Sequence, residues 1–155
     1  MPKSVLITGA SSGIGEALAR EFARRGWKIA IAARRLALLE TLTDELRALG
    51  SPRVAALALD VLDVPAIAPA VESADRELDG LDLVIANAGV AESFRAGAGE
   101  LAALQRVIGV NLTGACATID AAIALFLRRG RGGQVVGITS MARYRGLPQI
   151  GRAHV

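Results

Sequence analysis

The chain has 155 residues, of which 52% are hydrophobic and 21% charged, and its formal net charge is +3. This length and composition predict one globular domain, and no repeat, low-complexity tract or linker divides it. Basic residues occur in scattered short clusters with few aromatic residues among them, which argues against a nucleic-acid partner. The single cysteine, Cys116, excludes an internal disulfide and a multi-cysteine metal site, so no metal is expected. Its place in a long helical pattern predicts a buried, inert thiol.

No apolar run approaches the roughly 20 residues needed to span a bilayer, so we expect no membrane partner. The N-terminus enters a strand-like run at once, without a signal-peptide pattern. These features predict a soluble, cytoplasmic protein.

Short apolar runs alternate with stretches of helical spacing along the chain. Five runs rich in Val, Ile, Leu and Ala predict strands at residues 4–8, 28–33, 53–59, 81–86 and 134–139. Most of these runs are apolar at successive positions, which is typical of a parallel sheet covered on both faces. Four predicted helices lie between them, and the residues expected on their apolar faces are Ile14, Leu18 and Phe22; Leu39, Leu42, Leu46 and Leu49; Val64, Ile67, Val71, Ala74 and Leu78; and Leu104, Ile108, Leu112, Ile119 and Phe126. The alternation predicts an α/β fold.

Turn and capping residues agree with these boundaries. Gly26 and Gly50 stand where the first two helices should end, and Asp63 stands where the third should begin. Pro69 weakens the start of that third helix.

A glycine-rich loop, TGASSGIG from Thr8 to Gly15, follows the first predicted strand and opens the first predicted helix. Glycines there let the backbone approach a pyrophosphate, and the helix N-terminus offers free N–H groups and a partial positive charge. The spacing alone is weak, but a dinucleotide fold requires such a loop at this place. We therefore predict a phosphate site, against the alternative of a glycine-rich turn without a ligand. Its residues are Gly9, Ser11, Ser12, Gly13, Ile14 and Gly15.

Five motifs in chain order resemble those of the short-chain dehydrogenase/reductase family. The glycine loop has the family's G-x3-G-x-G spacing. Asp60-Val61 resembles the pair that contacts adenine, and Asn87-Ala88-Gly89 resembles the NAG motif that supports the sheet and lies along the cofactor. Asn111 resembles the helix asparagine of the catalytic tetrad, and Ser140 resembles its catalytic serine. Taken singly, each could be an ordinary cap, turn or surface residue; their order along the chain carries the resemblance.

The resemblance implies a Rossmann-type, doubly wound parallel sheet of five strands in the order 3-2-1-4-5, with the family's C-terminal strands missing. It implies an oxidoreductase that transfers hydride between a nicotinamide cofactor and a small-molecule alcohol or carbonyl. In that reaction Ser140 would polarise the carbonyl, and Asn111 would position a water in the proton relay. It also implies a homo-oligomer of the full-length protein through the helix at residues 100–129.

The end of the second strand favours NADP(H) over NAD(H). NAD-selective dinucleotide folds place an acidic residue there, which binds the ribose 2′-OH and repels a 2′-phosphate. This chain instead has Ala33-Arg34-Arg35, so Arg34 can offer its guanidinium to the phosphate, with Ser11 or Ser12 in reach. The alternative is that Arg34 and Arg35 simply begin a solvated helix.

The family's general acid/base tyrosine and the lysine four residues after it have no counterpart in the chain. The tyrosine position is Ala153, and the lysine would fall beyond Val155. Tyr144 cannot replace the pair, because Pro148 stands where the lysine should be. We interpret residues 1–149 as a truncated, inactive dinucleotide-binding domain. Residues 150–155, IGRAHV, depart from the family's pattern and match the translation of a common sequencing adapter, so we interpret them as a non-native tail.

Two other functions remain open at this stage. A non-catalytic dinucleotide sensor or regulatory module would also carry the glycine loop, but it has little chemical use for Ser140 and Asn111. A methyltransferase has a similar sheet but usually an acid where this chain has Arg34. The substrate cannot be identified, because only the segment after Gly89 and residues 141–148 would contribute to its pocket from this part of the family's fold.

Overall fold

The computed structural model describes residues 3–92 and 98–140. Five parallel strands form one sheet in the order β3-β2-β1-β4-β5. Their bounds are Ser4–Thr8 (β1), Lys28–Ala33 (β2), Val54–Ala58 (β3), Leu83–Ala86 (β4) and Gln134–Gly137 (β5). This confirms the predicted fold class and strand order; β3, β4 and β5 are each shorter than predicted.

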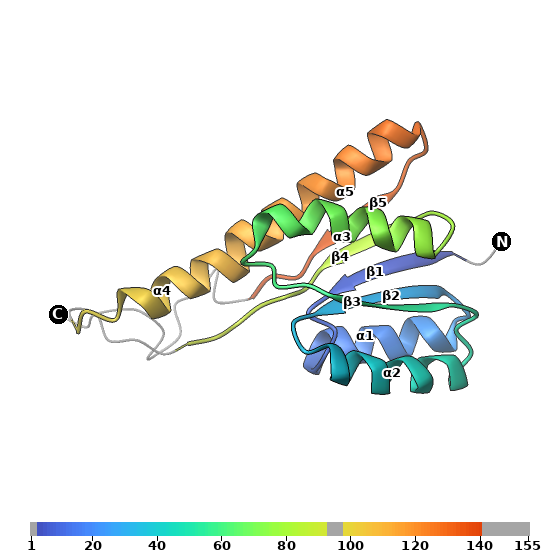
Figure 1. The fold of residues 1–155 in the computed structure, drawn as a ribbon, viewed down its shortest axis with the longest axis horizontal. Helices are drawn as coiled ribbons and strands as arrows, with labels where there is room; N and C mark the ends of the chain where they lie inside the picture. Colours follow the sequence, from blue (N-terminus) through green and yellow to red (C-terminus); the bar gives the residue numbers. More distant parts are fainter. Residues whose placement is uncertain (1–2, 93–97, 141–155) are drawn as a thin grey trace.

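Helices cover both faces of the sheet. The bounds are Gly13–Arg24 (α1), Leu36–Ala48 (α2), Val64–Glu77 (α3), Leu101–Ile108 (α4) and Ala115–Arg129 (α5), and a π-helical segment, η1 (Gly109–Gly114), joins the last two. Figure 1 shows α1 and α2 on one face, and α3 with α5 on the other. In the same view α4 runs out beyond the end of the sheet, and none of its residues is buried. The sheet is therefore doubly wound.

Alternate residues of each strand feed two separate cores, because successive side chains of a strand point to opposite faces. Val5 and Ile7 pack with the α1 and α2 side, whereas Leu6 packs with α3 and α5. Both sides are apolar, so strands that are apolar at every position satisfy both cores.

The predicted helix boundaries hold, but parts of two predicted apolar faces are wrong. Gly26 and Gly50 follow α1 and α2 with positive φ values of 71° and 113°, as expected of helix-ending glycines. In α1, Ile14 is 61% exposed and the buried residues are Gly15, Ala19 and Ala23. Small side chains thus let α1 lie close to the sheet, which a search for bulky apolar residues does not find.

Part of the apolar face predicted for the helix from α4 to α5 is wrong, whereas Phe126 is buried as predicted. Ile108 and Leu112 are exposed, whereas Val110, Gly114 and Thr118 are buried. Ile108 lies immediately before the π segment and Leu112 lies within it, where the chain departs from the 3.6-residue repeat on which the prediction was based. Cys116 is exposed, so the prediction of a buried thiol is wrong.

By length and composition alone, this helix could cross a membrane. Within the described residues, Leu101–Arg129 forms one helix of 29 residues that contains a strongly apolar window, 33% of which is buried. The expectation that no apolar run approaches membrane-spanning length is therefore wrong. The core helix of a soluble protein meets the same criterion, so the finding is weak evidence for a membrane.

Candidate functional site

The glycine loop turns from the end of β1 into the N-terminus of α1. Gly9 and Gly13 have positive φ values of 68° and 62°, which favour glycine. A Cβ on Gly13 would meet nothing within 4 Å, so the backbone there faces open space. Ser12 stands at the N-cap without a side-chain hydrogen bond to the helix, and the first-turn amides are not capped by it. The loop therefore keeps a helix N-terminus ready for an anion.

The other two glycines of the loop allow a close approach to the NAG motif. A Cβ on Gly9 would lie 2.6 Å from the Ala88 Cα, and one on Gly15 would lie 2.5 Å from the Asn87 Nδ2. Both distances are too short for real Cβ atoms. Gly9 and Gly15 are thus required by packing, whereas Gly13 leaves room on the ligand side.

Hydrogen bonds join the glycine loop to the NAG motif. Asn87 Nδ2 donates to the Thr8 carbonyl at 2.9 Å and to the Gly9 carbonyl at 3.3 Å. The backbone amides of Asn87 and Ala88 both donate to Thr8 Oγ1, at 3.1 and 3.2 Å. Sequence reasoning did not single out this role of Thr8, because its partners lie about eighty residues away. The carboxyl ends of strands β1 and β4 are therefore fixed to each other at the site.

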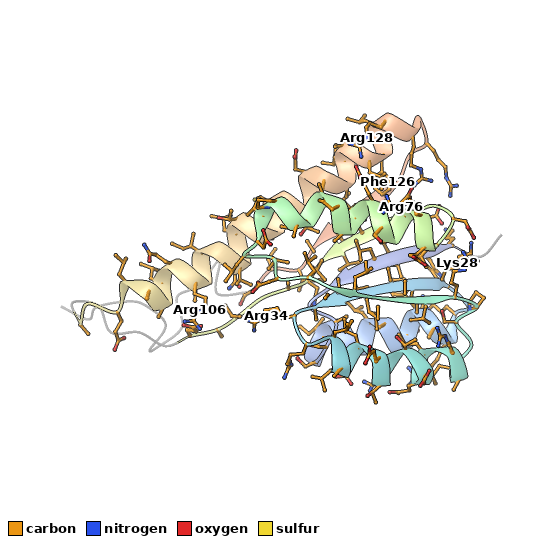
Figure 2. The ribbon with its side chains drawn as sticks, viewed as in Figure 1. Lys28, Arg34, Arg76, Arg106, Phe126 and Arg128 are labelled. Atoms are coloured by element: carbon orange, nitrogen blue, oxygen red, sulfur yellow. The ribbon has the colours of Figure 1, made fainter. Side chains whose placement is uncertain are left out.

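Two exposed arginines follow β2 at the same edge of the sheet. The side chain of Arg35 donates to Ser11 Oγ at 3.3 Å, which brings it to the glycine loop. Arg34 lies at the end of the sheet from which α4 extends, whereas Lys28 at the start of β2 lies at the opposite end (Figure 2). No acidic residue stands among Ala33, Arg34 and Arg35. A phosphate near Ser11 would find cationic side chains and no repelling carboxylate.

The Asp60-Val61 pair follows β3. Asp60 is half-buried, and its Oδ1 accepts a hydrogen bond of 3.0 Å from the Leu62 amide. Its carbonyl accepts another from the Asp63 amide, which closes the turn into α3. Val61 is buried. The pair is thus held in a defined turn at the carboxyl edge of the sheet.

Asn111 lies in the π segment η1, and its side chain is engaged with the chain just after the NAG motif. Its Oδ1 accepts from the Val90 amide and its Nδ2 donates to the Val90 carbonyl, both at 2.8 Å. Val90 is a contact that sequence reasoning missed, since it carries no polar side chain. The amide group of Asn111 therefore fixes the segment beyond Gly89.

Ser140 lies just beyond β5 and is exposed. Ala86 and Gly137 are register partners in β4 and β5, and the Ile138 amide donates to the Ala86 carbonyl. Ser140 therefore emerges at the same carboxyl edge as Asn87. Tyr144, residues 141–148 and the tail at 150–155 lie outside the described residues.

The glycine loop and the NAG motif thus meet where strand order reverses between β1 and β4, and the other predicted cofactor residues follow β2 and β3 at the same carboxyl edge of the sheet. Parallel α/β sheets bind ligands at this switch point, beyond the carboxyl ends of the strands. Two cavities of about 440 and 260 Å³ lie elsewhere, the first between α5 and β5 and the second between α3 and α5. Neither cavity is lined by a residue of the glycine loop. Within residues 3–92 and 98–140, no group of three or more His, Cys, Asp or Glu side chains could hold a metal ion.

Comparison with known proteins identifies the family. The family model described as short chain dehydrogenase matches residues 3–151. An uncharacterized oxidoreductase of Myxococcus xanthus is 41% identical over 94% of this chain and 56% of its own length. Galactitol 2-dehydrogenase of Agrobacterium fabrum is 33% identical over 93% of this chain and 55% of its own.

Solved structures agree. A short-chain type dehydrogenase/reductase from Mycobacterium marinum is 31% identical, with a TM-score of 0.88 over 96% of this chain and 60% of that one. An alcohol dehydrogenase from Thermococcus sibiricus, complexed with 5-hydroxy-NADP, is 33% identical, with a TM-score of 0.88 over 97% and 63%. The chain thus spans little more than half the length of these four relatives. It belongs to the short-chain dehydrogenase/reductase family of oxidoreductases.

Proposed function

We propose that the chain forms the NADP(H)-binding part of an oxidoreductase that transfers hydride between this cofactor and an alcohol or carbonyl. The observation that carries the proposal is the convergence of the glycine loop, the NAG motif and Arg35 at one edge of the sheet. NADP(H), when bound, supplies or accepts the hydride.

The site fits a dinucleotide phosphate group. The backbone around Gly13 faces open space, and the N-terminus of α1 is not capped by the Ser12 side chain. The pyrophosphate would lie there, because backbone N–H groups and the helix dipole both favour negative charge. Asp60 and Val61 would then contact the adenine, and Asn87, Ala88 and Gly89 would lie along the rest of the cofactor.

The preference for NADP(H) rests on the arginines after β2. Arg35 already reaches the glycine loop through Ser11, and Arg34 is its exposed neighbour. A guanidinium makes charge-assisted hydrogen bonds to a phosphate, whereas the 2′-OH of NAD(H) gains little from it. The complex of the Thermococcus sibiricus relative with 5-hydroxy-NADP supports the same assignment for this chain.

The preference is tested by reversing the charge of each arginine. Arg34→Asp and Arg35→Asp should each raise the Kd for NADPH about tenfold or more, because one charge-assisted bond contributes about 1.5–3 kcal/mol. The Kd for NADH should change much less. The matched control is Arg47→Asp, an equal change of charge at an exposed position near the other end of α2. Equal losses for both cofactors would refute the preference.

The catalytic part of the proposal concerns the whole protein. Hydride transfer to a carbonyl builds charge on oxygen, and Ser140 at the carboxyl edge would donate a hydrogen bond to it. In the full-length gene product, Ser140→Ala should lower kcat and leave the Kd for NADPH unchanged. A protein that binds NADPH but shows no turnover before the substitution would instead be the sensor module.

We also propose that the exposed apolar face of α4, η1 and α5 joins copies of the full-length protein. Its large exposed side chains are Leu101, Ile108, Leu112, Ile123 and Leu127. Exposed apolar patches of this kind mark association surfaces. Leu112→Asp should shift the full-length protein to a smaller species in light scattering, and an unchanged mass would contradict this interface.

A further inference from the structure

The helix that carries Asn111 is interrupted where it passes the turn after β3. Residues Gly109–Gly114 are π-helical and bounded by glycine at each end, between the α-helical segments α4 and α5. A π segment is less stable than α-helix and persists where surrounding contacts hold it.

Gly114 makes a contact that leaves no room for a side chain. It is buried, and an added Cβ would lie 2.8 Å from the Val61 carbonyl oxygen and 2.9 Å from the Val61 Cβ. Neither atom can move away by rotating a side chain. Helix and turn could therefore accommodate a methyl group only by separating.

Gly109, at the other end of the same segment, makes a different contact. An added Cβ would lie 2.6 Å from Leu62 Cδ2, the end of an exposed and flexible side chain. That side chain can rotate away at little cost. Gly109→Ala is therefore a matched control for Gly114→Ala, because it adds the same methyl group at the other end of the segment without a clash against the backbone.

Asn111 lies three residues before Gly114, so the depth at which the helix packs on Val61 sets how far its side chain reaches. Both residues belong to the short segment η1, so they shift together when that segment shifts. The two hydrogen bonds of Asn111 to Val90 are both 2.8 Å long. Such a two-point contact has little tolerance for a shift of the helix.

We infer that Gly114 is a positioning residue: by packing directly on Val61, it holds η1 at the depth at which Asn111 can bind Val90. The contact thereby couples the Asp60-Val61 turn to the segment beyond the NAG motif. The relevance of this coupling to cofactor binding and catalysis rests on the proposed function, whereas the coupling itself does not.

The test is amide hydrogen exchange of the whole chain by NMR, without cofactor. In Gly114→Ala the Val90 amide should exchange about tenfold faster or more, as expected for an overpacked contact. In Gly109→Ala it should exchange at the wild-type rate. The Ile7 and Ile31 amides, in the central strands, report global unfolding and separate it from a local effect. Equal Val90 rates in the two folded variants would overturn the inference.

A second pair of variants decides the matter if Gly114→Ala does not fold. Val61→Gly removes the Cβ and Cγ2 atoms that an added Cβ on Gly114 would meet at 2.9 and 3.0 Å, and Leu62→Gly is its control at the adjacent exposed position of the same turn. Faster exchange at Val90 in Val61→Gly than in Leu62→Gly supports the inference, and equal exchange in the two variants overturns it.

An NADPH titration of the same variants keeps the two proposals distinguishable. If the wild-type chain fails to bind NADPH, the proposed function fails, while the exchange rate at Val90 still reports on Gly114. If it binds, Gly114→Ala should raise the Kd and Gly109→Ala should not.

Discussion

Arg129 at the end of α5 is expected to contribute strongly to stability through Asp75 of α3. Arg129 forms an ion pair with Asp75 and also donates to the Leu81 carbonyl at 3.3 Å, while Asp75 accepts a 2.7 Å bond from the Leu81 amide. The two charged side chains are only 21% and 17% exposed. Figure 2 shows the neighbouring Arg128 on the same helix end, near Phe126.

Removing one partner of a fully buried pair costs about 3–5 kcal/mol, because the other charge is left without compensation. Partial exposure reduces this, so we expect Arg129→Ala to lower the free energy of unfolding by about 2 kcal/mol. The control is Arg128→Ala, whose pair with Glu72 has side chains 58% and 46% exposed and should contribute below about 0.5 kcal/mol. Urea denaturation measures both variants. Equal losses of unfolding free energy in the two variants would refute the claim that burial decides how much each ion pair contributes.

Two further predictions concern residues at the ends of the inner strands β1 and β4. Thr8→Val should lower the free energy of unfolding by about 1–3 kcal/mol, because the Asn87 and Ala88 amides lose their shared acceptor. Thr41→Val, at an exposed position of α2, should change it by less than about 0.5 kcal/mol in the same denaturation assay. Burial alone would raise the pKa of Asp82, but the Ser4 amide, Arg131 and the Ser4 hydroxyl together hold the pKa below the ordinary value of 3.8. Ionised Asp82 therefore stabilises the fold above that value, and its contribution is lost as the pH falls through the lower folded-state pKa. Asp82→Asn should flatten the acid limb of a plot of unfolding free energy against pH. An unchanged acid limb would contradict this.

The strands and the cofactor loop could be predicted because their signals are local, whereas the strand order followed from the family resemblance. Runs that are apolar at every position indicate a sheet covered on both faces, and a glycine loop after the first strand marks the first turn of a dinucleotide fold. The glycines that follow the first two helices, Gly26 and Gly50, can likewise be identified from the sequence itself. These features depend on a few consecutive residues.

Helix faces could be predicted only in part, because packing here selects small residues over bulky ones. Ile14, Ile108 and Leu112 looked like core residues and are exposed, whereas Gly114 and Thr118 are buried. A small residue contributes little to an apolar pattern, yet it lets the backbone approach its neighbour. The π segment, which breaks the α-helical repeat, has no sequence signal of its own.

The contacts within the site were the hardest to predict. Thr8 meets Asn87, and Asn111 meets Val90, across long stretches of chain. Arg35 reaches Ser11, although Arg34 was the residue expected to face the phosphate. The residue types of the site follow from sequence motifs, but their partners follow from the topology that brings the strand ends together.

The central claim, that the glycine loop binds a nicotinamide dinucleotide, is tested most directly by NADPH titration of two matched glycine variants. Gly13 and Gly26 stand at opposite ends of α1, with φ values of 62° and 71°, and a Cβ on either would meet nothing within 4 Å. Alanine at either position should lower the free energy of unfolding by a similar amount, about 1–2 kcal/mol, because of backbone strain. Only Gly13→Ala should weaken NADPH binding, about tenfold or more. Equal affinities of the two variants, or no saturable NADPH binding by the wild-type chain, would contradict the claim.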